Sequence, residues 1–355
     1  MTRKPDLQSL ANPSCPAPVA SDRITLSHGA GAGASSRLFE TIVWPQFQND
    51  ALGVRHDGAV FPAGPGGERL AFTTDSFVVH PIEFPGGDIG SLAVHGTLND
   101  LAMCGALPLG LSCAMILEEG LPLATLERIV ASMARAARAA GVAIVTGDTK
   151  VVERGKGDGL YLNTAGVGRV PDGRAVRPDR VCAGDAILVS GPLGDHGAAV
   201  LSVREGIEFE SEIISDSAWL GALVEILFEA VPELHCLRDP TRGGLGAVLH
   251  EIAAAAQLAI EIDEPALPVR DPVRAVCEVL GLDPLFLASE GCCVVFVPER
   301  AADRALAALR GTALGGCAAR IGTVYPGPPR VVVRTRAGTR RLLLLPAGDP
   351  LPRIC

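Results

Sequence analysis

The stretch LPLATLERIVASMARAARAAGVAIVTGDTK, residues 121–150, decides the fold class. Its apolar residues recur every three or four positions over 123–137, which predicts an amphipathic helix. Pro122 suits the first turn of this helix, and Gly141 suits its end. A strand is predicted directly afterwards at 142–146, ending at an Asp-containing turn. A helix followed at once by a strand predicts mixed α/β packing.

Working outward from this stretch, similar elements recur along the chain. The uncharged stretch 101–117 contains Gly105, Pro108 and Gly110, which favours strand–turn–strand over a membrane-spanning helix. A second strand that ends at an Asp-containing turn is expected at 70–74. We further expect strands at 161–167, 186–190, 259–262 and 293–297, and helices near 244–256, 273–280 and 300–309.

The length of 355 residues suits two domains better than one. Residues 1–23 are polar and proline-rich and are predicted to be a disordered extension. The polar, proline-bearing segment 171–180 predicts a boundary, with one domain over 24–175 and another over 176–340. The remaining segment, 341–355, holds three prolines after position 345, so we expect a mobile tail rather than a regular helix.

Composition narrows the classes of function. With a net charge of −9 and 4% aromatic residues, the chain lacks the basic, stacking surface of a typical nucleic-acid binder, so we expect no nucleic-acid partner. The first twenty residues contain no apolar segment of a secretory leader, and we expect no membrane association. Ten cysteines without a C-x-x-C pair argue against the usual zinc site and against a disulfide framework, which predicts a reducing cytoplasm.

The first motif that suits a chemical role is a glycine cluster, His28-Gly29-Ala30-Gly31-Ala32-Gly33. Glycines allow backbone N–H groups to approach phosphate oxygens closely. The cluster matches neither a Walker loop nor a dinucleotide fingerprint after a strand. A flexible loop without a ligand is therefore about as well supported.

Carboxylates at predicted strand ends form the second motif: Asp75, Asp100 and Asp148. Any one of them is explained as a cap on turn N–H groups. Carboxylates that converge from several strand-to-loop junctions would instead suit Mg²⁺, which takes few protein ligands together with phosphate oxygens. An acidic protein that binds an anionic nucleotide needs such a cation.

In the second half, Asp239-Pro-Thr-Arg-Gly-Gly244 directly precedes a predicted helix. The glycine pair and the helix N-terminus are able to receive an anion. An N-cap with a tight turn is an equally good local explanation.

The chain ends in Pro352-Arg353-Ile354-Cys355. The terminal cysteine is either an exposed thiol on a frayed end or a nucleophile on a flexible arm. It is not a prenylation signal, which needs three residues after the cysteine. Its own carboxylate disfavours the thiolate and Arg353 offsets this in part, so we predict ordinary acidity, with activation on docking.

These segments together resemble the HypE family, the carbamoyl dehydratases of hydrogenase maturation, within the PurM-like (aminoimidazole-ribonucleotide-synthetase-like) superfamily. The resemblance runs from about Ile24 to the end of the chain, and the Pro-Arg-Ile-Cys ending is its most specific part. Two positions depart from the family pattern, Ala32 in the glycine cluster and Ser289 before Glu290-Gly291. The other matching motifs are Thr74-Asp75-Ser76, Phe84-Pro85-Gly86-Gly87, Gly96-Thr97-Leu98-Asn99-Asp100, Leu117-Glu118-Glu119-Gly120-Leu121-Pro122, Thr146-Gly147-Asp148-Thr149-Lys150-Val151-Val152, Asn163-Thr164-Ala165-Gly166, Gly194-Asp195-His196-Gly197 and Asp239-Pro240-Thr241-Arg242-Gly243-Gly244.

The resemblance implies a PurM-like α/β fold with an N-terminal domain that dimerises through its sheets, a C-terminal α/β domain and a flexible C-terminal tail. It also implies ATP and Mg²⁺ as cofactors and dehydration of an S-carbamoyl group on Cys355 to a thiocyanate, which supplies cyanide to the iron of a nickel–iron hydrogenase. The implied partners are the carbamoyltransferase HypF as donor and the HypC–HypD iron-carrying complex as acceptor.

The resemblance further suggests roles for individual residues. Asp75, Asp100 and Asp239 are expected to hold Mg²⁺. Cys355 carries the reacting group, Glu290 is the expected base, and Lys150 neutralises charge or assists proton transfer. The expected nucleotide-binding residues are Gly29, Gly31, Gly33, Asp75, Asp100, Asp148, Thr149, Asn163 and Asp239.

Two other functions remain open from the sequence. A superfamily relative such as a selenophosphate synthetase would want a reactive cysteine in the glycine loop, whereas Cys15 lies thirteen residues before His28. A scaffold that docks partners through its tail would bind ATP without turnover.

Overall fold

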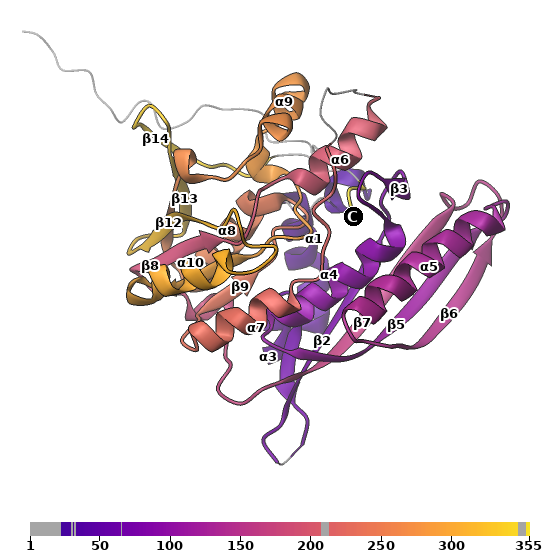
Figure 1. The fold of residues 1–355 in the computed structure, drawn as a ribbon, viewed down its shortest axis with the longest axis horizontal. Coiled ribbons are helices and arrows are strands. Elements are labelled where there is room, and N and C mark those ends of the chain that lie inside the picture. The colour runs from indigo at the N-terminus through magenta and orange to yellow at the C-terminus, as the bar shows by residue number, and fades with distance from the viewer. Residues whose placement is uncertain (1–22, 30, 32, 65, 207–212, 347–352) are drawn as a thin grey trace, which may run out of the picture.

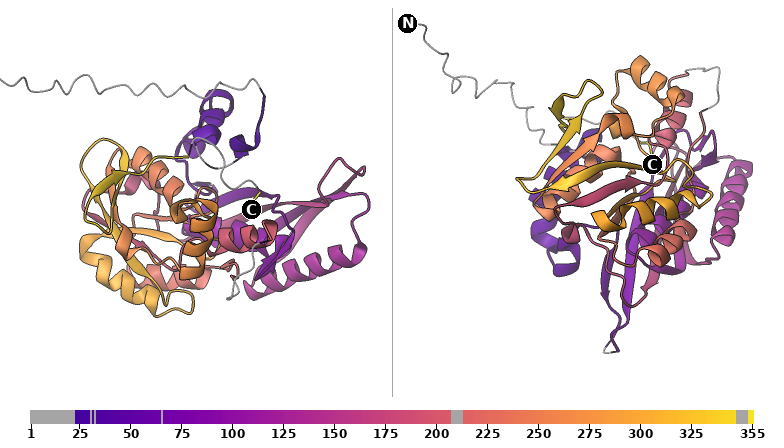
Figure 2. Two further views of the ribbon diagram at one scale, coloured as in Figure 1. Left: turned by 90° about the horizontal axis from the view of Figure 1, so that it is seen from above. Right: turned by 60° about the vertical axis from the view of Figure 1, so that its left-hand side comes forward.

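The computed structural model describes residues 23–29, 31, 33–64, 66–206, 213–346 and 353–355. They form two β-sheets that lie side by side, with helices packed on both (Figures 1 and 2). The sequence prediction of mixed α/β packing is confirmed. None of the described helices is long and apolar enough to cross a membrane.

The first sheet has five strands in the order β1-β2-β7-β5-β6. All neighbours are antiparallel except β5 and β6, which are parallel and joined by the crossover helix α5. A small hairpin of β3 and β4 precedes α4. The bounds are β1 Ala59–Pro62, β2 Arg69–Phe77, β3 Glu83–Phe84, β4 Gly87–Asp88, α4 Ile89–Met103, β5 Leu107–Glu118, α5 Leu123–Ala139, β6 Ile144–Val152 and β7 Leu160–Val170.

The second sheet has seven strands in the order β14-β13-β10-β12-β8-β11-β9. Its strands are antiparallel to their neighbours except β10 and β13, which are parallel. The bounds are β8 Asp185–Val189, α6 Asp195–Arg204, α7 Gly221–Ala230, β9 Cys236–Arg238, α8 Gly244–Ala256, β10 Ala259–Asp263, α9 Asp271–Leu280, β11 Val294–Pro298, α10 Ala302–Arg310, β12 Ala319–Tyr325, β13 Arg330–Arg334 and β14 Arg340–Leu342.

Short helical segments complete the chain. Those before β1 are η2 Leu26–Gly29, α1 Gly33–Leu38, η3 Phe39–Val43, α2 Trp44–Phe47 and α3 Asp50–Gly53. Four single turns of 3₁₀ helix lie in the second half, namely η4 Pro178–Arg180, η5 Glu264–Ala266, η6 Pro284–Phe286 and η7 Glu299–Ala301.

Most predicted elements are confirmed. Two strands were predicted too short, and the first strand of the strand–turn–strand predicted for 101–117 is wrong. The strand expected at 70–74 continues to Phe77, and the strand expected at 142–146 runs from Ile144 to Val152. Asp75 and Asp148 therefore lie within strands rather than in turns. Both strands are extended by pairing with distant neighbours, β7 and β5, which local sequence does not reveal. The stretch 101–117 is a helix end, a turn at Gly105 with φ of +71°, and then β5.

Helix α4 is the central helix of the molecule. It begins with a capping box in which Asp88 and Ser91 satisfy each other's backbone N–H groups. Nearly all of its side chains are buried, because it packs on the first sheet, on α5 and on α7. The side chain of Asn99 joins the two halves of the chain. Its amide donates to the carbonyls of Ala218 (3.0 Å) and Glu290 (3.3 Å), and its oxygen accepts from the Leu220 N–H (2.9 Å).

Two parts of the predicted mobile tail, 341–346 and 353–355, lie within the described residues. Arg341 and Leu342 pair with β13 as part of β14, so the sheet extends past residue 340. Residues 347–352 lie outside the described residues. The last residues return to the centre of the molecule, between the two sheets (Figures 1 and 2). There Ile354 is only 3% exposed and joins the core that α4, α6 and α9 share.

We predict that Gly90→Ala destabilises the protein. A Cβ at this position of α4 would lie 2.6 Å from the carbonyl oxygen of Ile129 in α5. Overpacking of this kind costs about 1–3 kcal/mol, which exceeds the gain of at most about 1 kcal/mol in helix propensity. Thermal unfolding measures the effect. Gly64→Ala, where an added Cβ meets nothing within 4 Å, is the matched control. An equal or higher melting temperature for Gly90→Ala would contradict the close packing of α4 on α5.

Candidate functional site

A pocket of about 220 Å³ lies where the two halves of the chain meet. Strand β2 and helix α4 contribute to it from the first half. The segment between β9 and α8, the residue Glu290 and the chain end contribute from the second half. Its lining includes two arginines, Arg238 and Arg242, and six acidic side chains, namely Asp57, Asp75, Asp100, Asp239, Glu251 and Glu290.

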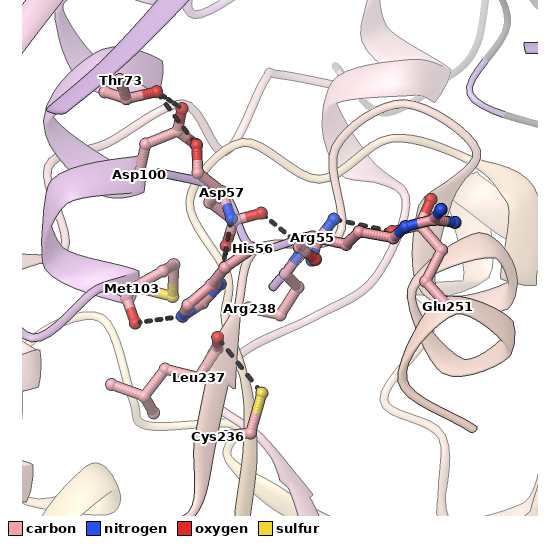
Figure 3. Close-up of polar contacts among 10 residues, drawn as sticks. All are labelled: Arg55, His56, Asp57, Thr73, Asp100, Met103, Cys236, Leu237, Arg238 and Glu251. Carbon is pink, nitrogen blue, oxygen red and sulfur yellow. Dashed lines mark hydrogen bonds and ion pairs between the residues drawn. The ribbon is translucent and has the colours of Figure 1, made fainter. Parts of the chain in front are cut away.

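Three of these carboxylates form a cluster with the geometry of a cation site. Oxygen atoms of Asp57, Asp100 and Asp239 lie within 4.8 Å of one another. Thr73 donates its hydroxyl to Asp100 (2.5 Å), as Figure 3 shows. Hard oxygen ligands suit Mg²⁺. The sequence analysis predicted Asp100 and Asp239 for this role but missed Asp57 and named Asp75 instead; Asp75 lines the same pocket.

Without a bound cation, burial makes the ionised forms of these carboxyl groups unfavourable. Burial, reinforced by Asp75 and Asp239, raises the pKa of Asp100 well above its usual value. Burial likewise raises the pKa of Asp239 to about 7, although Arg238 opposes the shift. One oxygen of Asp57, Oδ2, is buried and accepts no hydrogen bond from the described residues. A divalent cation would compensate all three groups, so the donor set fits Mg²⁺.

Arg238 neutralises only part of the acidic lining. Its guanidinium forms ion pairs with Asp57 and with Glu251 (2.6 Å to Oε2) and donates to the backbone carbonyl of Arg55 (2.9 Å; Figure 3). Arg242, the other arginine of the lining, interacts electrostatically with Asp75, Asp100 and Glu290. The pocket thus keeps an excess of negative charge.

His56 places Asp57. Its Nε2 lies 3.1 Å from the carbonyl of Met103 and must donate to it, so Nδ1 is free to accept the Asp57 N–H at 2.9 Å (Figure 3). Burial lowers the pKa of His56 to about 3, which keeps the ring neutral. In the sequence, Asp57-Gly58 has only the pattern of a turn, so no local signal identified Asp57.

The glycine cluster packs against the segment that follows Asp239. A Cβ on Gly31, where φ is +70°, would lie 2.9 Å from the carbonyl oxygen of Arg242, so this close approach requires glycine. Gly31 lines the pocket, and the carbonyl of Gly29 accepts from Arg242 (3.4 Å). Gly33 begins α1 and is not part of the lining. Ala32 lies outside the described residues.

Other predicted site residues also lie outside the pocket of the single chain. Asp148, Thr149 and Lys150 are exposed on β6 at the edge of the first sheet, where Lys150 pairs with Asp148 (2.8 Å). Asn163 on β7 lies behind the lining. Its amide donates to the Asp75 carbonyl (2.8 Å) and so supports the strand that carries this carboxylate.

The chain end forms one wall of the pocket. It runs beside residues 78–80, where the Val78 N–H donates to the Cys355 carbonyl and the His80 N–H to that of Arg353, both at 3.2 Å. The Arg353 side chain donates to the Val78 carbonyl (3.0 Å) and pairs with Asp158. Cys355 thereby lines the pocket together with Glu290.

Burial shifts the acidity of both Cys355 and Glu290. Burial raises the pKa of the Cys355 thiol above its usual value, Glu290 adds to the shift, and Arg242 opposes it. The prediction of ordinary acidity with activation on docking is therefore wrong for the docked end. Burial and then Asp239 raise the pKa of Glu290 well above its usual value. Glu290 is 2% exposed, and its Oε1 has no hydrogen-bond partner among the described residues.

Known proteins are similar to this chain in sequence over nearly its whole length and in fold. The AIR synthase related protein N-terminal domain matches residues 55–170, and the corresponding C-terminal domain matches residues 183–334. Carbamoyl dehydratase HypE of Azotobacter vinelandii is 51% identical over 333 residues, 94% of this chain and 97% of the relative. That of Escherichia coli is 49% identical over 339 residues, 94% of this chain and 100% of the relative. The chain belongs to the HypE family of carbamoyl dehydratases.

Solved HypE structures agree with this assignment. HypE in complex with ATP superposes with a TM-score of 0.79 at 49% identity, covering 94% of this chain and all of that one. A HypE–HypF complex gives a TM-score of 0.83 at 44% identity, covering 87% and 99%. The predicted PurM-like fold and carbamoyl dehydratase family are confirmed. The predicted domain limits at 175 and 340 stay predictions.

One departure from the HypE pattern has a structural explanation. Ser289 replaces the asparagine often found before Glu290-Gly291, and its hydroxyl accepts the N–H of Gly194 (2.8 Å). A short polar acceptor is therefore retained next to Glu290.

We predict that Mg²⁺ stabilises this protein more at pH 8 than at pH 5. The folded-state pKa of Asp239 is raised from 3.8 to about 7, so the folded protein retains a proton that the unfolded chain releases. Stability without metal therefore falls as the pH rises between these values, and a cation bound at the carboxylates reverses the loss. Thermal unfolding at both pH values, with and without Mg²⁺, measures the difference.

Asp239→Asn sharpens this test. At pH 8 without Mg²⁺ we expect a melting temperature about 2–4 °C above that of the unchanged protein, the shift that about 1 kcal/mol produces in a domain of this size. The added stabilisation by Mg²⁺ should largely disappear. Asp303→Asn, on the exposed face of α10, is the matched control and should respond to Mg²⁺ like the unchanged chain. An undiminished Mg²⁺ response of Asp239→Asn would exclude this residue as a ligand.

Proposed function

We propose that this chain is an ATP-dependent carbamoyl dehydratase that converts an S-carbamoyl group on Cys355 to a thiocyanate during maturation of a nickel–iron hydrogenase. The observation that carries the proposal is the position of the chain end. Cys355 lies in a pocket with a buried carboxyl group, Glu290, and with a carboxylate cluster of the kind that binds Mg²⁺. The solved relative that contains ATP supports ATP as the second substrate.

The chemistry explains why ATP is needed. A carboxamide oxygen is a poor leaving group, so loss of water from R–S–C(=O)–NH₂ does not proceed by itself. Transfer of the γ-phosphoryl group of ATP to that oxygen, with loss of one N–H proton, gives ADP and an imidate phosphate. Loss of inorganic phosphate and of the second N–H proton then leaves R–S–C≡N. The protein has to position the groups, neutralise charge and accept protons.

The acidic cluster would bind Mg²⁺, and the ion would neutralise the negative charge of the phosphate groups. Asp57, Asp100 and Asp239 would hold the ion, with Asp75 at the side of the same pocket. When bound, Mg²⁺ neutralises phosphate charge as the phosphoryl group is transferred. Arg242 adds a positive charge from the chain itself. Its guanidinium interacts electrostatically with Cys355, Asp75 and Glu290, and it can also interact with an anionic substrate.

Glu290 is suited to accept the N–H protons. Its carboxyl group is buried, lines the pocket beside Cys355 and has an unpartnered oxygen among the described residues. A raised pKa makes a carboxylate a stronger base, and Arg242 together with a bound cation favours its ionised form.

The sulfur acts as a carrier. Because burial raises its pKa, the docked thiol is a weak nucleophile, and it is the carbamoyl group attached to the sulfur that reacts there. Acquisition of the carbamoyl group therefore requires Cys355 to leave the pocket. The solved complex of relatives supports HypF as the carbamoyl donor, and we propose the HypC–HypD iron-carrying complex as the cyanide acceptor.

We further propose a homodimer and a cytoplasmic location. Strand β6 is exposed along its length, with Val145 and Val151 more than 60% exposed, which supports pairing of two copies at this edge. Nucleotide binding by Asp148 and Thr149, and charge neutralisation by Lys150, would then act in the assembled dimer. The nine cysteines in the described part of the chain are all free, in keeping with a reducing compartment.

Glu290→Gln tests the proposed base. We expect thiocyanate formation on carbamoylated Cys355 to slow by about 10²–10⁴-fold, the usual contribution of general acid–base catalysis, with ATP binding retained. Mass spectrometry of the C-terminal peptide measures the loss of one water. Glu278→Gln, on the exposed face of α9, is the matched control. An undiminished rate in Glu290→Gln would remove this residue from the mechanism.

Deletion of Cys355 separates the dehydratase from a docking scaffold. We expect the shortened chain to keep its fold and its ATP binding while forming no thiocyanate and losing ATP hydrolysis that depends on the carbamoyl donor. Unchanged donor-dependent hydrolysis of ATP would contradict the proposed reaction.

A further inference from the structure

The segment 215–218 lies between the two groups that react. It lies shortly before α7, contacts the backbone of Glu290 directly, and reaches Ile354, the residue before Cys355, through His196. Neither the sequence motifs nor the roles considered above include any of its residues.

Asp216 holds Glu290 from behind. Its two carboxylate oxygens accept the N–H groups of Glu290 and Gly291, each at 3.1 Å. The carbonyl of Glu290 accepts in turn from the Ala218 N–H (3.4 Å). A Cβ on Gly291 would lie 1.8 Å from the carbonyl oxygen of Asp216, so this approach is possible only with glycine. The backbone of the proposed base is thus fixed on both sides by one segment.

Ser215 holds the chain end through His196. The buried imidazole lies 2.8 Å from the Ile354 carbonyl through Nε2 and 2.8 Å from the Ser215 hydroxyl through Nδ1. A carbonyl only accepts, so Nε2 carries the proton and Nδ1 accepts from Ser215. Burial lowers the pKa of His196 to about 4, which keeps this tautomer neutral. The ring of Phe84 packs edge-on against the imidazole at 5.2 Å between centroids.

The segment is itself anchored to the N-terminal half. The Ser215 N–H donates to the Pro85 carbonyl (2.8 Å). A Cβ on Gly86 would lie 2.9 Å from both the backbone nitrogen and the carbonyl oxygen of Ser215. The hydroxyl of Ser217 lies 3.0 Å from His95 Nδ1 on α4. A rigid support of this kind is what positioning residues need.

We propose that Ser215 and Asp216 position both reacting groups from one segment, Asp216 by fixing the backbone of Glu290 and Ser215 by orienting His196 toward the carbonyl before Cys355. This inference rests on the proposed function, because it assigns the base and the carrier to Glu290 and Cys355. Asp216 and His196 are positioning residues: they act through Glu290 and Ile354 and need not touch the carbamoyl group.

The geometry favours this over a purely structural role. A structural role requires only that the hydrogen bonds be made somewhere in the fold. Here the bonds of Asp216 end on the backbone of Glu290 and Gly291, and the bond of His196 ends on Ile354, the neighbour of Cys355. Misplacement of a reacting group by about 1 Å costs on the order of 10²-fold in rate. The effect should therefore appear in the chemical step and not in substrate binding.

The experiment uses the full chain carbamoylated on Cys355, mixed with saturating ATP and Mg²⁺ in a single turnover, with water loss followed by mass spectrometry. For Asp216→Asn, which keeps one acceptor oxygen, we expect dehydration to slow by about 10-fold or more, with the KM for ATP unchanged within about twofold. Asp172→Asn, in the exposed turn after β7, is the matched control and should react at the unchanged rate.

A second measurement follows the chain end directly through alkylation of free Cys355 by a bulky maleimide. We expect His196→Ala to increase the alkylation rate several-fold and to slow dehydration. His196→Gln, whose amide can still donate to the Ile354 carbonyl, should restore both values at least in part. Asp216→Asn should leave alkylation unchanged, because it acts on Glu290 alone.

Each outcome decides the inference. Unchanged dehydration in both Asp216→Asn and His196→Ala would overturn it, as would a loss of rate in His196→Ala that His196→Gln does not rescue. If Asp216→Asn does not fold, the His196 pair and Ser215→Ala decide by the same criteria. An unchanged chain that forms no thiocyanate would overturn the proposed function, whereas the alkylation contrast would still test the contact to the chain end.

Discussion

The arrangement of this protein depends on one electrostatic constraint: six carboxyl-bearing side chains line the pocket at the junction of its two halves, with two arginines among them, and three of the six, Asp100, Asp239 and Glu290, are buried. Burial penalises their ionised forms, and the raised pKa values of Asp100, Asp239 and Glu290 express that penalty. Such a pocket costs stability in the unliganded chain. The same acidity suits the pocket to attract a divalent cation, and it keeps a carboxyl group of raised pKa, Glu290, beside the chain end.

Docking of the chain end follows from the same junction. Ile354 inserts into the core shared by α4, α6 and α9, and backbone hydrogen bonds to Val78 and His80 align the final residues. While docked, the thiol is held in its neutral form by burial and by neighbouring carboxylates, which makes the free sulfur a weak nucleophile there.

Much of the fold could be predicted from local pattern. The helices at 123–137 and 244–256 were predicted well because their apolar spacing and their end signals, Pro122 and Gly141 for the first, are local properties. The strands of the first sheet were predicted too short. Thr74-Asp75-Ser76 and Gly147-Asp148-Thr149 have turn-like sequences, and only pairing with β7 and β5 makes them strands.

The sequence by itself determined the residue types of the site and, through the resemblance, the family: Asp100, Asp239, Glu290 and the terminal Cys355 stand in motifs that are recognisable along the chain. Only the tertiary structure decided which of them meet. It brought Asp57 into the carboxylate cluster through a buried histidine, left Asp148, Thr149 and Lys150 on an exposed edge strand, and placed Asp216 behind Glu290. The physical reason is that convergence depends on contacts between segments far apart in the chain, such as residues 56 and 103 or 216 and 290, and such contacts leave no periodicity or spacing in the sequence.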